Sequence, residues 1–190
     1  MRRARRRALP WLAVAALLAA LGFFWVQSGG LVPDWWREGV QSLDLTGDGA
    51  PETLMLRRRA LTVTDAAGRV LWETERGWLA QDALAADIDG DGAPELLALV
   101  WKRGSYGPAR PFWVERDETG FSQHIFIYRW DEAQQKFRPL WMASALHPRV
   151  KSWALSENSV LAIETETGEA TRWAWRGWGL SRIDAPPRPM

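Results

Sequence analysis

Short runs of apolar or alternating residues, separated by turn residues, fill the chain from Val40 onward. Runs of roughly four to eight residues are typical of β-strands. Two pairs of runs flank tight turns and predict hairpins, residues 61–65 with 69–74 and 160–165 with 170–175. Residues 95–101 have the length of a buried strand, and residues 124–130 alternate before a polar turn and a strand at 137–142. The pattern therefore predicts an all-β body.

The start of the chain has a different pattern, in which a basic segment precedes an apolar run. Leu9–Val26 contains 18 residues without a charge. As a helix rising about 1.5 Å per residue, the run spans about 27 Å, which is enough for a bilayer core. We expect a basic cytoplasmic end at 1–8 and a transmembrane anchor at 9–27, with the N-terminus inside. The alternative is a cleaved signal peptide, but the apolar run is long for one and no A-x-A site follows it.

The segments after the anchor divide into a linker at 28–39, an extracytoplasmic β domain at 40–184 and a tail at 185–190. The β domain contains an internal repeat, because Leu43–Leu56 aligns with Ala86–Leu99. A Trp-bearing strand follows each copy, and a third, degraded unit begins near Trp153 without an acidic loop. Repeats of about 40 residues in a β chain are typical of propeller blades or stacked arrays.

The most specific motif is DIDGDGAPE, at residues 87–95, which spaces three carboxylates two residues apart. A glycine at the sixth position permits a sharp turn, and the seventh residue can offer its carbonyl oxygen. Oxygen-only ligands at this spacing suit calcium. The motif is not an EF-hand, because that loop needs Glu at its twelfth position. The expected calcium ligands are Asp87, Asp89, Asp91, Ala93 through its backbone, and Glu95.

The earlier copy, DLTGDGAPE at residues 44–52, keeps most of this pattern but has Thr46 in place of the second acid. One fewer charge predicts a weaker affinity for calcium. The simpler alternative for both copies is an Asp/Gly turn that hydrogen-bonds its own backbone. The ligands that this copy offers are Asp44, Thr46, Asp48, Ala50 through its backbone, and Glu52.

The doubled D-x-D-G-D-G-x-x-E pattern, followed by an apolar strand, resembles the FG-GAP/VCBS repeats of bacterial surface proteins and integrin alpha-chain propellers. The resemblance implies blade-like antiparallel repeats, here two clear and one degraded, with calcium bound in the loops at residues 44–52 and 87–95. The chain departs from the family in size, because propellers typically have about four to eight blades and this one has room for three. A partial propeller, a compact β module and a ring completed by oligomerisation all remain open.

A long insert at residues 101–123 interrupts the second repeat with aromatic and basic residues. Insertions on repeat folds often form a binding face, which makes a carbohydrate or wall polymer a possible ligand. The alternative is that these aromatics cover a sheet edge. His124 is expected to be a packed or surface residue. The candidate ligand-binding residues are Trp101, Tyr106, Arg110 and Trp113.

Composition and charge exclude several kinds of site and binding partner. The absence of cysteine excludes disulfides and thiolate metal sites. Five of the 24 basic side chains lie in the first seven residues, so the remainder carries 19 against 23 acidic ones and gives no support for nucleic-acid binding. We expect a membrane-anchored, calcium-binding repeat module that binds or scaffolds at the cell envelope, and not an enzyme. The expected partner is an envelope polysaccharide or another surface protein. The alternatives are a carbohydrate- or wall-polymer-binding module that uses the insert at 101–123, a calcium-dependent hydrolase, and an accessory subunit of a membrane complex.

Overall fold

The computed structural model describes residues 18–19, 36–104, 112, 115–117, 119–156 and 159–184. The chain divides into a first unit, Met1–Trp36, and a second unit, Arg37–Met190. The basic end at 1–8, the anchor at 9–27 apart from two residues, most of the linker at 28–39 and the tail at 185–190 lie outside the described residues. Among the residues that are described, none forms a helix long and apolar enough to cross a membrane.

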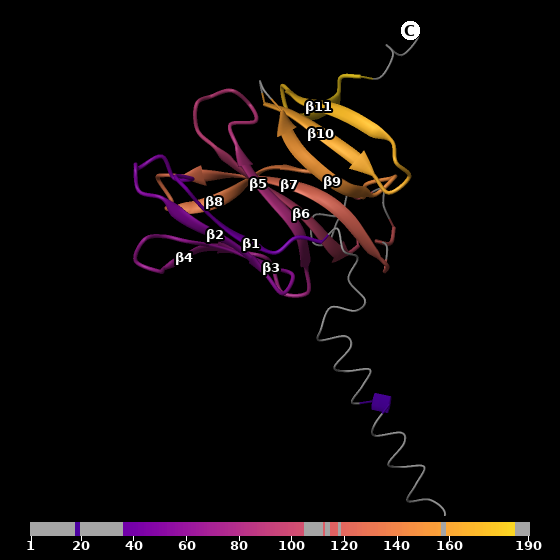
Figure 1. Cartoon of the computed structure of the whole chain (residues 1–190), viewed down its shortest axis with the longest axis horizontal. Coiled ribbons are helices and arrows are strands. Elements are labelled where there is room, and N and C mark those ends of the chain that lie inside the picture. The colour runs from indigo at the N-terminus through magenta and orange to yellow at the C-terminus, as the bar shows by residue number, and fades with distance from the viewer. Residues whose placement is uncertain are drawn as a thin grey trace, which may run out of the picture. The chain divides into compact units, whose positions relative to one another are not determined.

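The described part of the second unit is all-β and contains three four-stranded antiparallel sheets, each made of consecutive strands (Figure 1). The first sheet consists of β1 (Gly39–Leu43), β2 (Glu52–Arg57), β3 (Ala60–Thr64) and β4 (Val70–Glu73). The second consists of β5 (Leu79–Ala86), β6 (Glu95–Arg103), β7 (Phe121–Asp131) and β8 (Lys136–Met142). The third consists of β9 (Val150–Ser156), β10 (Val160–Thr165), β11 (Ala170–Arg176) and β12 (Gly179–Arg182).

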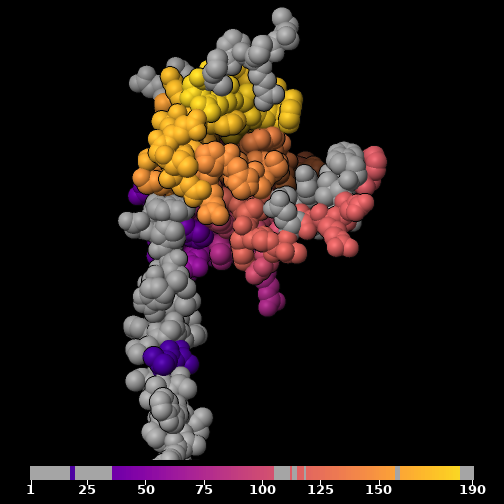
Figure 2. Space-filling model, turned by 90° about the vertical axis from the view of Figure 1, so that its right-hand side faces the viewer, coloured from indigo at the N-terminus to yellow at the C-terminus, as the bar shows by residue number. Residues whose placement is uncertain are grey.

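The second sheet lies between the other two and is buried on both faces. Leu96, Ala98 and Val100 of β6 face one hydrophobic cluster, which contains core residues of the first sheet. Leu97 and Leu99, which alternate with them, face a second cluster with core residues of the third sheet. Figure 2 shows the yellow and orange atoms of the third sheet in continuous contact with the salmon atoms of the second. Because both faces are covered, β6 and β7 are buried along most of their length.

The two outer sheets each have one apolar and one more polar face. In β2, buried Leu54 and Leu56 alternate with Met55 and Arg57, which are exposed. In β11, buried Thr171 is flanked by exposed residues on both sides. Terminal repeats with a polar outer face allow a repeat array to end in solvent. The faces of the first and third sheets that point away from the second sheet are therefore the more polar ones.

The structure confirms the two predicted hairpins, which are β3–β4 and β10–β11. The strands predicted on either side of the polar turn also pair, as β7 and β8. The two aligned segments of the internal repeat occupy equivalent places. Each contains the last residue of the first strand of its sheet, the acidic loop, and the beginning of the second strand. The Trp-bearing strands that follow are β4 and β8, the fourth strand of each sheet. The third unit begins at Val150, three residues before the expected start, and its first connection is short.

Candidate metal centre

The two acidic loops connect the first and second strands of their sheets, residues 44–51 between β1 and β2 and residues 87–94 between β5 and β6. Both loops turn on two glycines. Gly90 and Gly92 have φ values of 81° and 96°, a conformation that residues with a Cβ rarely adopt. Gly47 and Gly49 repeat it with 77° and 85°. The same sequence spacing therefore produces the same backbone path twice.

The first aspartate of each loop accepts hydrogen bonds from the loop's own backbone. Asp87 Oδ1 accepts from the Gly90 N–H at 2.7 Å, and Oδ2 accepts from the Gly92 N–H at 3.0 Å. Asp44 accepts from the amides three and five residues later at 2.6 and 2.9 Å. This arrangement satisfies the turn's amide groups and fixes the carboxylate at the loop's centre. The backbone hydrogen bonding expected of a simple Asp/Gly turn is thus present in both copies.

The acid at the fifth position closes the second half of each loop. Asp91 Oδ1 accepts from the Ala93 N–H at 2.9 Å, and Asp48 Oδ1 accepts from the Ala50 N–H at 2.8 Å. The two alanines, which were expected to offer carbonyl oxygens to an ion, thus take part in the loop through their N–H groups. A carbonyl role for them stays a prediction.

The glutamate at the ninth position is buried beneath each loop. Glu95 is 0% exposed and Glu52 is 2% exposed. Glu95 Oε2 accepts from the Ile88 N–H at 3.0 Å. Glu52 Oε2 accepts from the Leu45 N–H at 2.7 Å and from the Thr46 N–H at 3.1 Å. Each glutamate therefore joins the start of the second strand to the first residues of the loop.

The two loops differ at the third position, where the first has Thr46 and the second has Asp89. The Thr46 hydroxyl donates to Glu52 Oε1 at 3.2 Å. Asp89 carries a negative charge and no proton to donate, so the same oxygen of Glu95 needs another donor. Arg129 supplies it, with its Nε 3.1 Å and its Nη2 3.0 Å from Glu95 Oε1.

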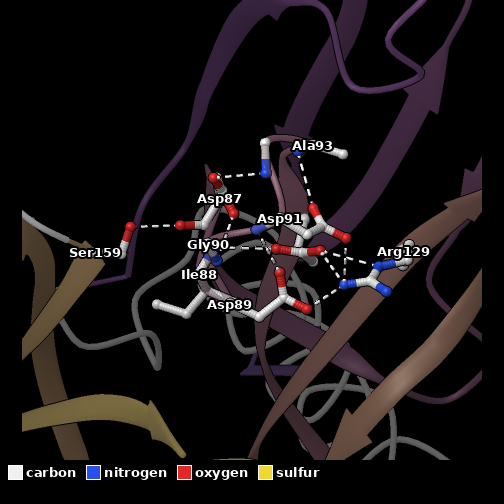
Figure 3. Close-up of polar contacts among 10 residues, drawn as sticks. Asp87, Ile88, Asp89, Gly90, Asp91, Ala93, Arg129 and Ser159 are labelled. Carbon is white, nitrogen blue, oxygen red and sulfur yellow. Dashed lines mark hydrogen bonds and ion pairs between the residues drawn. The ribbon is translucent and has the colours of Figure 1, made fainter.

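Arg129 lies on β7 and is the counter-cation of the second loop (Figure 3). Its Nη2 forms ion pairs with Asp89, with Asp91 at 3.0 Å and with Glu95 at 3.0 Å. The strand register explains its position, because the pair Leu96–Tyr128 brings Arg129 next to the first residue of β6. One guanidinium thus contacts three of the four acids in the motif.

Burial and charge shift the ionisation of this cluster in opposite directions. Burial raises the pKa of Glu95, and the charge of Asp89 adds to this, while the Ile88 amide and Arg129 act against it. Burial lowers the pKa of Arg129, but its hydrogen bonds with Glu95 and the charges of the neighbouring carboxylates outweigh this and raise it. The guanidinium therefore remains charged and offsets part of the repulsion among the acids.

The second loop is also fixed to the third sheet. The side chain of Ile88, 2% exposed, belongs to the hydrophobic cluster that the second and third sheets share. The Ser159 hydroxyl, just before β10, donates to the carbonyl oxygen of Asp87. The site therefore depends on β5, β6, β7 and the start of β10. In the first loop, Leu45 occupies the position equivalent to Ile88. It is 1% exposed and belongs to the hydrophobic cluster that the first and second sheets share.

Three carboxylate oxygens of the second loop have a spacing that a hard cation can bridge. One carboxylate oxygen from each of Asp87, Asp89 and Glu95 lies within 4.8 Å of the other two. Two ligands on calcium, each at about 2.4 Å, are separated by at most about 4.8 Å. Asp91 is joined to this group through Arg129. Within the described residues the first loop forms no comparable cluster of acids, consistent with its missing charge.

Of the residues proposed for a polysaccharide, only Trp101 is described. Its indole N–H donates to Gln81 at 2.8 Å, and the Arg149 guanidinium lies 5.3 Å from its ring centroid. Trp101 is thus engaged within the fold. Tyr106, Arg110 and Trp113 lie outside the described residues, so their proposed role stays a prediction.

His124 is buried at 0% exposure, which confirms the expectation of a packed residue. Its Nε2 lies 2.8 Å from the Ser122 hydroxyl and its Nδ1 lies 3.0 Å from the Ala143 carbonyl. Sequence reading missed this pair. With Ser122 only 8% exposed, the pair is closed to a substrate and serves packing.

Sequence reading also missed Arg129, which is separated from the acids by 34 to 40 residues along the chain. The signal that could have found it is the pairing of β6 with β7, which places Arg129 beside Glu95. The insert between these strands hides that register from the sequence. No protein-family model matches the chain, and no curated protein matches it in sequence.

Proposed function

We propose that this chain is a membrane-anchored, extracytoplasmic β-repeat module that binds calcium at the loop between β5 and β6. The observation that carries the proposal is the convergence of Asp87, Asp89 and Glu95 within 4.8 Å at the end of a turn. Three carboxylates held together at a surface need a compensating cation. Arg129 brings one positive charge to a cluster of four acids, so a net negative charge remains.

The FG-GAP/VCBS resemblance is part of this proposal. The support is that both motif copies lie at the same point of two four-stranded antiparallel sheets, and that the sheets pack face to face. Propeller blades have both properties. A stack of three blade-like sheets with polar outer faces favours a compact module over a ring completed by other copies.

Calcium in this module would act structurally. Its ligands would come from Asp87, Asp89, Asp91, Glu95 and the Ala93 carbonyl, and it would supply the positive charge that the acids lack. The loop joins β5 to β6, and its Asp87 carbonyl oxygen accepts a hydrogen bond from Ser159 beside the third sheet. Fixing it would stabilise the junction between the second and third sheets.

The cellular setting follows from the sequence. Arginines at the start and the apolar run at 9–27 favour a single-pass anchor with the β domain outside the cytoplasm, where calcium is abundant. A binding or scaffolding role at the envelope, with a polysaccharide or another surface protein as the partner, agrees with a rigid β module whose motifs contain no catalytic constellation.

The test is thermal unfolding of the full chain in detergent, with calcium chloride and with a chelator. Asp89→Asn combined with Asp91→Asn is the test variant, and Asp48→Asn in the first loop is the matched control. Calcium at about 100 times its dissociation constant stabilises the folded state by about 2.7 kcal/mol. We expect a rise in Tm of several degrees that the double variant loses and the control keeps. An equal Tm with calcium and with chelator would refute calcium binding.

A further inference from the structure

We infer that Arg129 is a resident counter-cation of the second acidic loop, which a divalent ion must displace in order to bind. This inference rests on the calcium function proposed above and concerns the regulation of the same site. A metal ion and a guanidinium would compete for the same oxygens. Occupation by calcium would then release Arg129 from β7.

The contacts of Arg129 are those of a substitute for a metal ion. Its Nη2 reaches Asp89, Asp91 and Glu95, and its Nε adds a second contact to Glu95. Two of these residues, Asp89 and Glu95, also belong to the group whose oxygens lie within 4.8 Å. Calcium placed among these oxygens would lie close to a positive charge, and like charges repel strongly at short range. The two cations therefore exclude each other.

Comparison with the first loop shows that an arginine faces the buried glutamate only where the third position of the loop is an acid. There the pair Thr53–Thr64 places Asp65 next to Glu52, at the position that Arg129 has relative to Glu95. Asp65 instead pairs with Arg69 at 3.0 Å. Thr46 is neutral and donates its own hydroxyl to Glu52. The acid at the third position and the facing arginine therefore occur together in the second loop, and both are absent from the first.

Arg129 has room to leave. Its side chain is 36% exposed. It lines an open hollow of about 350 Å³, together with Asp131, Glu132 and Arg138. The acids of this hollow offer other partners for the guanidinium, although Asp131 already pairs with Arg138 at 3.0 Å. A displaced Arg129 can thus remain at the surface of the hairpin β7–β8 without being buried alone.

Three consequences follow. The loop keeps its shape without a metal ion, because Arg129 offsets the repulsion among the acids. Calcium binding releases the guanidinium of Arg129 to the surface of the hairpin β7–β8. A partner that recognises this positive charge would bind the calcium-loaded protein in preference to the calcium-free protein. The wild-type affinity for calcium is reduced by the competition.

The test is isothermal titration of the full chain in detergent with calcium chloride, for wild type, Arg129→Gln and the control Arg138→Gln. Coupling between two sites of a protein typically changes affinity 5- to 150-fold, so we expect Arg129→Gln to bind calcium about tenfold tighter or better. Arg138→Gln should match wild type, because Arg138 pairs with Asp131 outside the loop. Equal or weaker binding by Arg129→Gln would overturn the inference and leave the calcium site standing. Absence of binding by all three at about 1 mM, the weak end for extracellular calcium modules, would instead overturn the proposed function.

A second measurement covers the case in which Arg129→Gln fails to fold. Heteronuclear NMR of wild type follows the Nε–H resonance of Arg129, assigned with the Arg129→Lys variant. Because this N–H donates to Glu95 at 3.1 Å, we expect its resonance to shift and to lose protection from exchange as calcium is added. An unchanged resonance at calcium saturation would overturn the displacement.

Discussion

Arg129 on β7 lies against Glu95 at the start of β6, with 3.0 Å between Nη2 and Oε1. Glu95 is fully buried, while the side chain of Arg129 is 36% exposed. The pair joins two neighbouring strands at the point where the acidic loop begins. The charge of the loop and the stability of the central sheet are therefore linked.

The glutamate beneath the first loop is expected to contribute strongly to stability. Glu52→Ala removes the acceptor of the buried Leu45 N–H, at 2.7 Å, and of the Thr46 N–H. An unsatisfied buried donor costs about 1–3 kcal/mol, so we expect a loss of about 2–3 kcal/mol in urea unfolding. Glu73→Ala, on the exposed edge strand β4, is the control and should change stability by less than about 0.5 kcal/mol. Equal effects of both variants would contradict a structural role for Glu52.

A buried glutamine joins the second and third sheets. Gln123 Oε1 accepts from the Val150 N–H at 2.6 Å, and its Nε2 donates to the Val150 carbonyl at 2.8 Å and to Gln81 at 2.7 Å. Gln123→Leu leaves the backbone groups at the start of β9 without these partners. We expect a loss of about 2–3 kcal/mol, measured by urea unfolding. The control is Gln41→Leu on exposed β1, which should leave the free energy of unfolding nearly unchanged. An unchanged free energy of unfolding in Gln123→Leu would show that packing alone holds the two sheets together.

The turn between β2 and β3 is strained and can be improved. Arg58 and Arg59 have φ values of 51° and 66° in a two-residue hairpin turn. Such turns favour Asn-Gly because both positions need positive φ. Relief of the strain at two non-glycine residues with positive φ should raise stability by about 1 kcal/mol on replacing the two arginines by Asn and Gly, measured as a rise in Tm. The reverse change at another turn, Gly68→Ala at a φ of 79°, should lower Tm, and a Tm that falls in both variants would contradict the strain.

The carboxyl of Asp82 predicts a pH dependence of stability. Burial raises the pKa of Asp82 above its ordinary value of 3.8, although the Ala83 amide, the Trp153 indole and Arg37 act against this. The folded state thus holds the proton more tightly than the unfolded state. The stabilising effect of this proton is complete below about pH 3.8 and is lost as pH rises through the folded pKa.

Asp82→Asn removes this titration and keeps an acceptor for the Trp153 N–H, which lies 3.1 Å from Asp82 Oδ2. We therefore expect the variant to gain stability relative to wild type between pH 3 and pH 7, about the range over which the carboxyl titrates. Urea unfolding at both pH values measures this difference. If the difference in unfolding free energy between wild type and the variant is the same at both pH values, Asp82 has the same pKa in the folded and unfolded states.

Much of the fold could be predicted from the sequence, because local pattern determines it. The hairpins at 61–74 and 160–175 follow from short alternating runs on either side of a turn. The loop at 87–95 follows from its glycines and acids, because the hydrogen bonds within the loop span at most seven residues. The equivalence of the two loops was visible as a repeat for the same reason.

Contacts between segments far apart in the chain could not be predicted in this way. Arg129 meets Asp89 across 40 residues, and Gln81 meets Val150 across 69. The first depends on the register of β6 and β7, which a long connection separates, and the second depends on the packing of the second sheet against the third. The burial of β7 on both faces has the same origin, because it results from sheets that pack on either side.

The most direct measurement is the number of calcium ions bound per chain, by equilibrium dialysis of the full chain against radioactive calcium at about 1 mM, the weak end of extracellular affinities. We predict one ion per chain, lost in Asp87→Asn and retained in Asp44→Asn, because the clustered acids lie in the second loop only. No bound calcium, or an ion that Asp87→Asn leaves in place, would contradict the assignment of the loop between β5 and β6 as the metal centre.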